Sequence, residues 1–187
     1  QNAHIKNSNF FDLEKTSDQN SLLPHMLPDA KYWEETVSNL GIKNSDHIIV
    51  YDNSDVMSSC RIWYNFLYFG HSPDLISVLN GGLKKWLIEK KETVNYDKYF
   101  SKSSYAVTED LSMVLNKNQI NENIKNKTFE LIDARSEERF HGLQLEPRKE
   151  LKSGNIEGSK NVPFMELINE KDNTFKDKRE LGLVFEK

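Results

Sequence analysis

Helical and strand-like segments alternate along residues 29–88, and this alternation limits the possible folds more than any other feature of the sequence. Apolar residues recur at helical spacing in three stretches, and two short runs with strand character lie between them. In order, the expected elements are a helix over 29–40, a strand over 47–51, a helix over 58–69, a strand over 76–79 and a helix over 83–88. Helices that alternate with buried strands over such lengths indicate an α/β fold with a parallel sheet.

The remaining sequence predicts a second unit of the same kind. Residues 99–127 are dominated by Lys, Asn, Ser, Glu and Asp and are expected to form a linker between residues 1–98 and residues 128–187. A weak repeat supports this division, because His4-Ile5-Lys6-Asn7-Ser8 resembles Asn155-Ile156-Glu157-Gly158-Ser159 at an offset of 151 residues. Two copies of one unit are therefore predicted. Both are expected to be incomplete in this chain, since the second has few residues for an α/β core.

Charge and apolar patterning argue against several classes of protein. The chain has 25 Lys and Arg against 29 Asp and Glu, and its net charge of −4 is unlike that of a basic nucleic-acid-binding protein. No apolar run approaches the roughly 18 residues of a membrane span, and no signal-peptide pattern is present. Cys60 is the single cysteine, which excludes an internal disulfide framework, and the histidines form no metal-ligand spacing with it. A cytoplasmic protein without a metal or cofactor is expected.

Arginine is scarce in this lysine-rich chain, yet three of the five arginines fall within 14 residues. They are Arg135, Arg139 and Arg148. Lysine would serve for solubility, so guanidinium groups at these positions suggest planar, bidentate contacts to an anion. The alternative is a set of surface ion pairs.

Several segments of the chain together resemble the tandem rhodanese family, and within it the 3-mercaptopyruvate sulfurtransferases. The segments are HIKNSNFFD (4–12), PHMLP (24–28), IIVYD (48–52), RIWYNFLYFGH (61–71), VLNGGLKKW (78–86), IDARSEERF (132–140), EPR (146–148) and SGNIEGSKNVPF (153–164). The resemblance implies two rhodanese-like domains, each a parallel sheet flanked by helices, of which the first is non-catalytic. It also implies that a cysteine at the start of a loop in the second domain carries sulfur as a persulfide.

The chain itself does not supply that cysteine. A thiolate nucleophile needs a lowered pKa, which inward-pointing backbone N–H groups ahead of a helix provide. The corresponding loop position in the first copy is Asp52, whose carboxylate cannot accept sulfur and would be satisfied by such amides. Cys60 is expected to be a partly buried helical residue rather than a nucleophile activated by Arg61. By the repeat, the equivalent loop of the second copy would begin about 16 residues beyond Lys187, so the catalytic cysteine is expected there.

The resemblance also assigns candidate roles to individual residues. Arg139 and Arg148 match the positions that hold the carboxylate and keto group of mercaptopyruvate, and Arg148 favours that donor over thiosulfate. Arg135 is expected to pair with a carboxylate for structural reasons. Glu14 and His25 match a first-domain pair proposed to assist proton transfer at the cleft between the domains, although Glu14 replaces the usual aspartate. The alternative for His25 is a packed histidine that caps a turn.

These residues imply an enzyme, a sulfurtransferase that moves sulfane sulfur from 3-mercaptopyruvate or thiosulfate. The acceptor would be cyanide or a thiol such as that of thioredoxin. The alternative is a non-catalytic rhodanese-like module that binds a partner or an anion. Phosphatases built on a related fold would show a loop one residue longer that ends in arginine.

Overall fold

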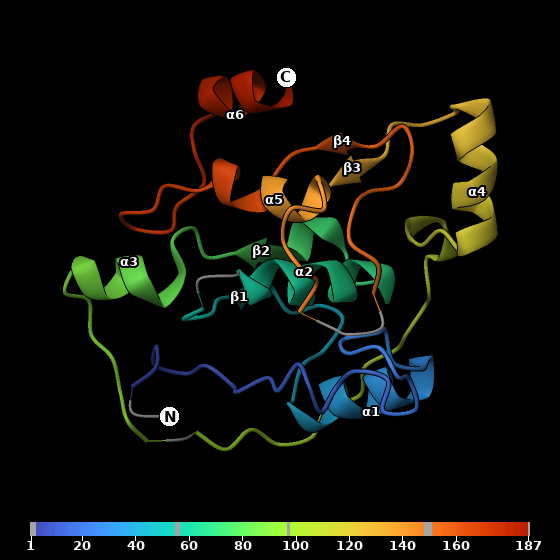
Figure 1. Cartoon of the computed structure of the whole chain (residues 1–187). Helices are drawn as coiled ribbons and strands as arrows, with labels where there is room; N and C mark the ends of the chain where they lie inside the picture. Colours follow the sequence, from blue (N-terminus) through green and yellow to red (C-terminus); the bar gives the residue numbers. More distant parts are fainter. Residues whose placement is uncertain (1–2, 55–56, 97, 148–150, 187) are drawn as a thin grey trace. The chain divides into compact units, whose positions relative to one another are not determined.

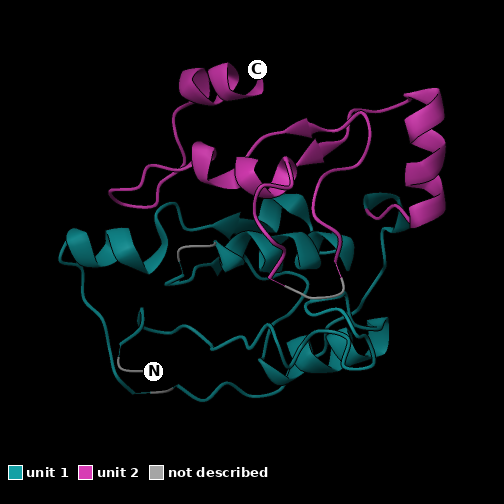
Figure 2. Cartoon of the chain, viewed as in Figure 1, with its two compact units in different colours: residues 1–113 teal, residues 114–187 magenta. Residues whose placement is uncertain are grey.

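The computed structural model describes residues 3–54, 57–96, 98–147 and 151–186. The chain forms two compact units, Gln1–Met113 and Val114–Lys187 (Figure 2). The segment expected as a linker, residues 99–127, is divided between these units. The assignment of residues 1–98 and 128–187 to two rhodanese-like domains stays a prediction.

The first unit contains the predicted alternation of helices and strands (Figure 1). Its elements are α1 (Ala30–Asn39), β1 (Ile48–Val50), α2 (Ser58–Tyr68), β2 (Ile76–Val78) and α3 (Gly82–Ile88), with short 3-10 helices at Pro73–Leu75 and Leu111–Met113. Strands β1 and β2 are parallel, with Ile48 opposite Ile76 and Val50 opposite Val78. The expected α/β class with parallel pairing is therefore confirmed in this unit.

Helix α1 begins and ends where its sequence provides caps. The Asp29 carboxylate accepts the backbone N–H of Tyr32 at 2.9 Å and satisfies one of the free donors of the first turn. At the other end the chain leaves the helix through Gly41, whose φ of +74° is in the left-handed region. These local signals place the apolar face of α1, with Trp33 and Val37, against the core.

The core of the first unit is built around Trp33, which is completely buried. Its ring stacks on Phe69 at a centroid distance of 4.7 Å and meets Phe66 edge-on at 5.1 Å. The buried core cluster consists of Trp33, Val37, Ile62, Phe66, Tyr68, Phe69, Ile76 and Tyr105. Tyr105 lies in the segment expected as a linker, yet its backbone N–H donates to the Ser38 hydroxyl. This part of the segment therefore belongs to the first core.

Histidine 71 shows how polar groups are accommodated in this core. Its Nδ1 lies 3.0 Å from the Tyr105 hydroxyl, and its Nε2 lies 3.1 Å from the carbonyl oxygen of Asp46. A buried imidazole with both nitrogens engaged has a structural role.

The second unit has less regular structure. It contains α4 (Lys117–Asn126), β3 (Ile132–Asp133), α5 (Glu137–Phe140), β4 (Lys160–Asn161), a 3-10 helix at Phe164–Leu167 and α6 (Lys178–Phe185). Strands β3 and β4 are parallel, with Ile132 opposite Lys160 and Asp133 opposite Asn161. Helix α4 falls within the expected linker, where Asn116 and Gln119 form a reciprocal capping box at its start. This cap was not predicted from the polar composition.

The two segments related by the sequence repeat form the same turn. In the first, the Ser8 hydroxyl donates to the carbonyl oxygen of Ile5 at 2.7 Å. In the second, the Ser159 hydroxyl donates to the carbonyl oxygen of Ile156 at 2.6 Å. The residue before each serine has a positive φ, +66° at Asn7 and +80° at Gly158. The likeness between the segments therefore extends to backbone conformation and hydrogen bonding.

Candidate functional site

The loop after β1 holds a carboxylate, Asp52, two residues beyond the end of the strand. The Asp52 side chain accepts the backbone N–H of Ser59 at 2.8 Å and the Ser54 hydroxyl at 3.0 Å. Its carbonyl oxygen accepts the backbone N–H of Leu83 at 2.9 Å. The backbone N–H of Ser59 thus satisfies the Asp52 carboxylate in the expected way. Residues 55–56 of the loop lie outside the described residues. Asp52 thus joins α2 and α3 to the end of β1, which is a structural task.

Cys60 lies on α2, one residue after the amide that binds Asp52. Burial of its side chain, and then the negative charge of Asp52, raise the pKa of the thiol. A thiol with a raised pKa is protonated at neutral pH and is a poor nucleophile. The neighbouring Arg61 donates through Nη2 to the carbonyl oxygen of His25 at 2.5 Å, and its charge does not lower the pKa of the thiol. These observations favour the structural interpretation of Cys60.

A cavity of about 870 Å³ lies beside β1 in the first unit. Asp46 and Asp52 are among the residues that line it, together with His4, His47 and several phenylalanines. None of the described residues that line it is a lysine, arginine or cysteine. The described lining thus offers an anionic donor no permanently charged cation, whereas the arginines of the candidate site lie in the second unit.

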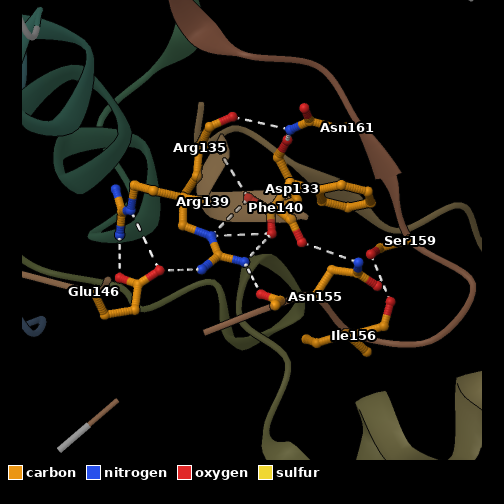
Figure 3. Close-up of polar contacts among 10 residues, drawn as sticks. Asp133, Arg135, Arg139, Phe140, Glu146, Asn155, Ile156, Ser159 and Asn161 are labelled. Atoms are coloured by element: carbon orange, nitrogen blue, oxygen red, sulfur yellow. Dashed lines mark hydrogen bonds and ion pairs between the residues drawn. The ribbon is translucent and has the colours of Figure 1, made fainter. Parts of the chain in front are cut away.

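Arg135 is the central cation of a polar cluster in the second unit (Figure 3). Its Nε and Nη2 form a fork onto the Asp133 carboxylate, with the shortest contact 2.6 Å from Nη2 to Oδ2. Nη1 donates to Glu146 at 2.6 Å, and Nη2 also donates to the carbonyl oxygen of Gly154 at 2.7 Å. All three nitrogens are bonded, so the expected structural role of Arg135 agrees with its contacts.

Arg139 extends the cluster from helix α5. Its Nη2 donates to Glu146 Oε2 at 2.6 Å, and its Nε lies 3.3 Å from Oε1 (Figure 3). Glu146 therefore binds both guanidinium groups, and only 1% of its side chain is exposed. The Nη1 group of Arg139 has no partner among the described residues, and 30% of the side chain remains exposed. Arg139 can thus bind an external anion without losing its pairing to Glu146.

The backbone under this cluster is fixed by strand β4. The Asn161 side chain donates to the carbonyl oxygens of Asp133 and Arg135, each at 2.9 Å (Figure 3). A side-chain amide that bridges these carbonyls holds the turn after β3 in one conformation. The Asn155 side chain donates to the Phe140 carbonyl at the end of α5. The arginines are therefore carried by a hydrogen-bonded framework rather than by a free loop.

Comparison with known proteins identifies the family of the chain. The family model of the rhodanese-like domain matches the sequence of residues 1–89. The crystal structure of SseA from Escherichia coli, described as a 3-mercaptopyruvate sulfotransferase, superposes with a TM-score of 0.87 and 30% identity over 98% of this chain and 67% of SseA. The chain belongs to the rhodanese family. Its relatives include mouse thiosulfate sulfurtransferase, 37% identical over 189 residues, and an Arabidopsis thaliana thiosulfate/3-mercaptopyruvate sulfurtransferase, 38% identical over 207 residues.

This rhodanese chain is shorter than the curated proteins it matches. The mouse relative aligns with all of the chain, but the chain spans 63% of that relative's length. The Arabidopsis relative aligns with 98% of the chain, which spans 59% of that protein. The rhodanese fold and the α/β class expected from the sequence are thus confirmed.

Of the other residues expected at the site, Glu14 and His25 lie in the described part of this rhodanese chain. His25 has a φ of +59°, and its carbonyl is held by Arg61. The Glu14 carbonyl accepts the Gln19 side-chain amide at 2.8 Å, and no hydrogen bond joins the Glu14 and His25 side chains within the described residues. Arg148 lies outside the described residues. Roles for Glu14, His25 and Arg148 therefore stay predictions.

Three side chains that hold the cluster together were not predicted from the sequence. Glu146, Asn155 and Asn161 each hold an arginine or the backbone next to one. Glu146 carried a signal, since it is an acidic residue immediately before a proline in an arginine-rich stretch. The asparagines carried none, because a chain rich in asparagine offers no contrast at these positions.

The arginines shift the titration of both carboxyl groups of the cluster. Hydrogen bonds from Arg139, with its charge and that of Arg135, hold the pKa of Glu146 below its usual range. Hydrogen bonds from Arg135 lower the pKa of Asp133 in the same way. A carboxyl with a depressed folded-state pKa stabilises the fold above its unfolded pKa. This stabilisation is lost as the pH falls through the folded pKa.

The second unit is therefore expected to lose stability below about pH 4, where carboxyl groups begin to protonate. Thermal unfolding followed by NMR of amide signals from residues 114–187 would measure this at about pH 7, 4 and 3. Asp133→Asn should remove part of the pH dependence, because the variant has no carboxyl to titrate there. A midpoint that does not change between neutral and acidic pH would contradict the prediction.

Proposed function

We propose that the full-length protein is a sulfurtransferase that accepts sulfane sulfur from 3-mercaptopyruvate, or from thiosulfate, through a cysteine persulfide. The sulfur-carrying cysteine is proposed to lie beyond Lys187. The observation that carries the proposal is the Arg139 guanidinium, which Glu146 holds through Nε and Nη2 while Nη1 has no partner in the described part of the chain. The similarity to sulfurtransferases over the whole of this chain supports the same activity.

The chemistry follows from the donor. The cysteine thiolate attacks the sulfur of 3-mercaptopyruvate, so that an S–S bond forms and the C–S bond breaks. The electron pair of the broken bond leaves on carbon as pyruvate enolate, which takes up a proton to give pyruvate. A thiolate acceptor, such as that of thioredoxin, or cyanide then attacks the outer sulfur and releases the cysteine thiolate. With thiosulfate the leaving group of the first step is sulfite.

The residues of this chain would bind the donor rather than form bonds to it. A forked guanidinium matches a carboxylate, and Arg139 and Arg148 would hold the carboxylate and keto oxygens of mercaptopyruvate. His25, with Glu14 as its proposed partner in proton transfer, would protonate the enolate, since histidine is the side chain that most often acts as a general acid or base. The first unit, with Asp52 at its loop, has no sulfur-accepting group at that position.

The direct test uses the protein encoded by the complete gene. Purified protein with 3-mercaptopyruvate and cyanide should release pyruvate and thiocyanate in equal amounts. The gene is expected to encode a cysteine about 12–20 residues after Lys187, at the start of a glycine-containing loop, and its replacement by serine should abolish turnover. An aspartate, a serine or a stop codon there would favour the non-catalytic binding module instead.

Arg148→Ala in the full protein should raise the KM for 3-mercaptopyruvate about tenfold or more, and the KM for thiosulfate much less. Only mercaptopyruvate offers a carboxylate for a bidentate contact, and a hydrogen bond to a charged group contributes roughly 1.5–3 kcal/mol. Steady-state assays with both donors measure the difference. Arg179→Ala is the matched control, because Arg179 is exposed on α6. Equal KM changes for the two donors would remove the preference assigned to Arg148.

A further inference from the structure

Glu146 is the side chain that joins the two described arginines of the candidate site. Its Oε1 accepts from Arg135 Nη1 at 2.6 Å and from Arg139 Nε at 3.3 Å. Its Oε2 accepts from Arg139 Nη2 at 2.6 Å. With 1% of the side chain exposed, the carboxylate has little contact with water. One buried carboxylate therefore fixes the plane of the Arg139 guanidinium.

The arrangement is anchored at strand β3, which ends in Asp133. Arg135 is fixed by its fork onto Asp133 and by the Gly154 carbonyl. Because Arg135 in turn donates to Oε1 of Glu146, it fixes the position of the carboxylate that also accepts from Arg139. The cluster is a linear series in which Asp133, Arg135, Glu146 and Arg139 alternate in charge. Only its last member, Arg139, has a nitrogen without a partner among the described residues.

We propose that Glu146 is a positioning residue for the sulfur donor, holding Arg139 so that its Nη1 donors meet the donor anion without prior reorientation. The inference rests on the proposed sulfurtransferase function. An unrestrained arginine loses side-chain entropy when it binds a ligand, whereas a guanidinium ordered during folding does not lose it again. The buried carboxylate would thus supply a preorganised site.

This role opposes the electrostatic effect of the same residue. A carboxylate next to the donor site repels an anionic donor, so its charge alone weakens binding. Replacement of Glu146 by glutamine removes the charge and keeps the shape. If Glu146 only contributed charge, the variant would bind the donor more tightly. If it positions Arg139, the variant binds less tightly in spite of the added net positive charge.

The experiment compares Glu146→Gln with wild type in the full protein, with 3-mercaptopyruvate and thiosulfate as donors. The KM for each donor is expected to rise about tenfold to a hundredfold, since a misplacement of about 1 Å can reduce an enzyme's efficiency by up to about a hundredfold. Transfer from the persulfide to cyanide should not change. Glu137→Gln is the matched control, because it removes one charge from the same segment at a side chain that is 75% exposed. Its KM should stay within about twofold of wild type.

NMR of the Arg139 Nε–H group gives a readout that does not need turnover. The wild-type 187-residue chain should show a slowly exchanging Nε–H signal, which Glu146→Gln should lose. Glu146→Asp keeps the charge but shortens the reach by one methylene, and it should also raise the donor KM. An unchanged or lowered KM in both variants, or the loss of folding in both, would overturn the positioning role. Absence of sulfur transfer by wild type with either donor would instead overturn the proposed function.

Discussion

Replacing Trp33 by alanine should lower the free energy of unfolding of the first unit by about 3–5 kcal/mol. The side chain is completely buried and contacts three aromatic rings, those of Phe11, Phe66 and Phe69. Removal of a buried tryptophan leaves a cavity that the surrounding rings cannot fill, and it also removes ring contacts worth about 0.5–1.5 kcal/mol per pair. Domains of this size are stable by roughly 5–15 kcal/mol, so the loss is a large fraction of the total.

The loss would be measured by urea unfolding followed by circular dichroism, which is needed because the variant lacks one of the three tryptophans. Tyr99→Ala is the control, since it removes an aromatic ring that is 90% exposed, and it should change the stability by less than about 0.5 kcal/mol. Trp33→Phe should lose less than Trp33→Ala because it keeps a ring in the core. It also removes an indole N–H that is buried without a partner among the described residues. Equal losses for phenylalanine and alanine would show that the ring contacts do not stabilise the unit.

Order and type of the elements in the first unit could be predicted because local signals and burial agree there. In α1 the cap at Asp29, the spacing of Trp33 and Val37, and the exit at Gly41 all favour the same helix. In β1 and β2 the apolar runs are short, but their β-branched residues distinguish them from helices. Three independent signals at one segment leave few alternatives.

The segment expected as a linker was harder to predict because its structure depends on contacts with distant residues. Tyr105 lies in a polar stretch, and it is buried because its ring packs against Phe66 and His71 and its polar groups bond to Ser38 and His71. Helix α4 has few apolar residues and depends on a capping box between Asn116 and Gln119. Composition alone does not distinguish such a helix from a solvated linker.

The candidate site was predicted in part for a related reason. The cluster of arginines pointed to anion chemistry, and Arg135 was expected to pair with a carboxylate, which the structure identifies as that of Asp133. Which arginine keeps a free nitrogen depends on where Glu146 lies, and that is a tertiary fact. A sequence can therefore indicate that guanidinium groups gather, but not how their hydrogen bonds are shared.

Arg135 and Arg139 form different hydrogen bonds within the cluster, so we expect their replacement to affect different properties of the protein. Arg135→Ala would leave the Asp133 and Glu146 carboxylates close together without the cation between them. Removing one partner of a buried ion pair leaves an uncompensated charge, and three of the Arg135 contacts here lie at 2.6–2.7 Å. Because the guanidinium is partly exposed, we expect a loss of about 2–4 kcal/mol in the stability of the second unit, below the upper range for fully buried pairs.

Arg135→Lys should not restore this stability. A lysine ammonium carries the same charge but has no planar fork, so it cannot serve Asp133, Glu146 and the Gly154 carbonyl at the same time. Thermal unfolding followed through NMR signals of residues 114–187 would measure both variants against Arg179→Ala, an arginine exposed on α6. A lysine variant as stable as wild type would show that charge alone holds the cluster. Glu146 would then lack the rigid anchor from which it is proposed to orient Arg139.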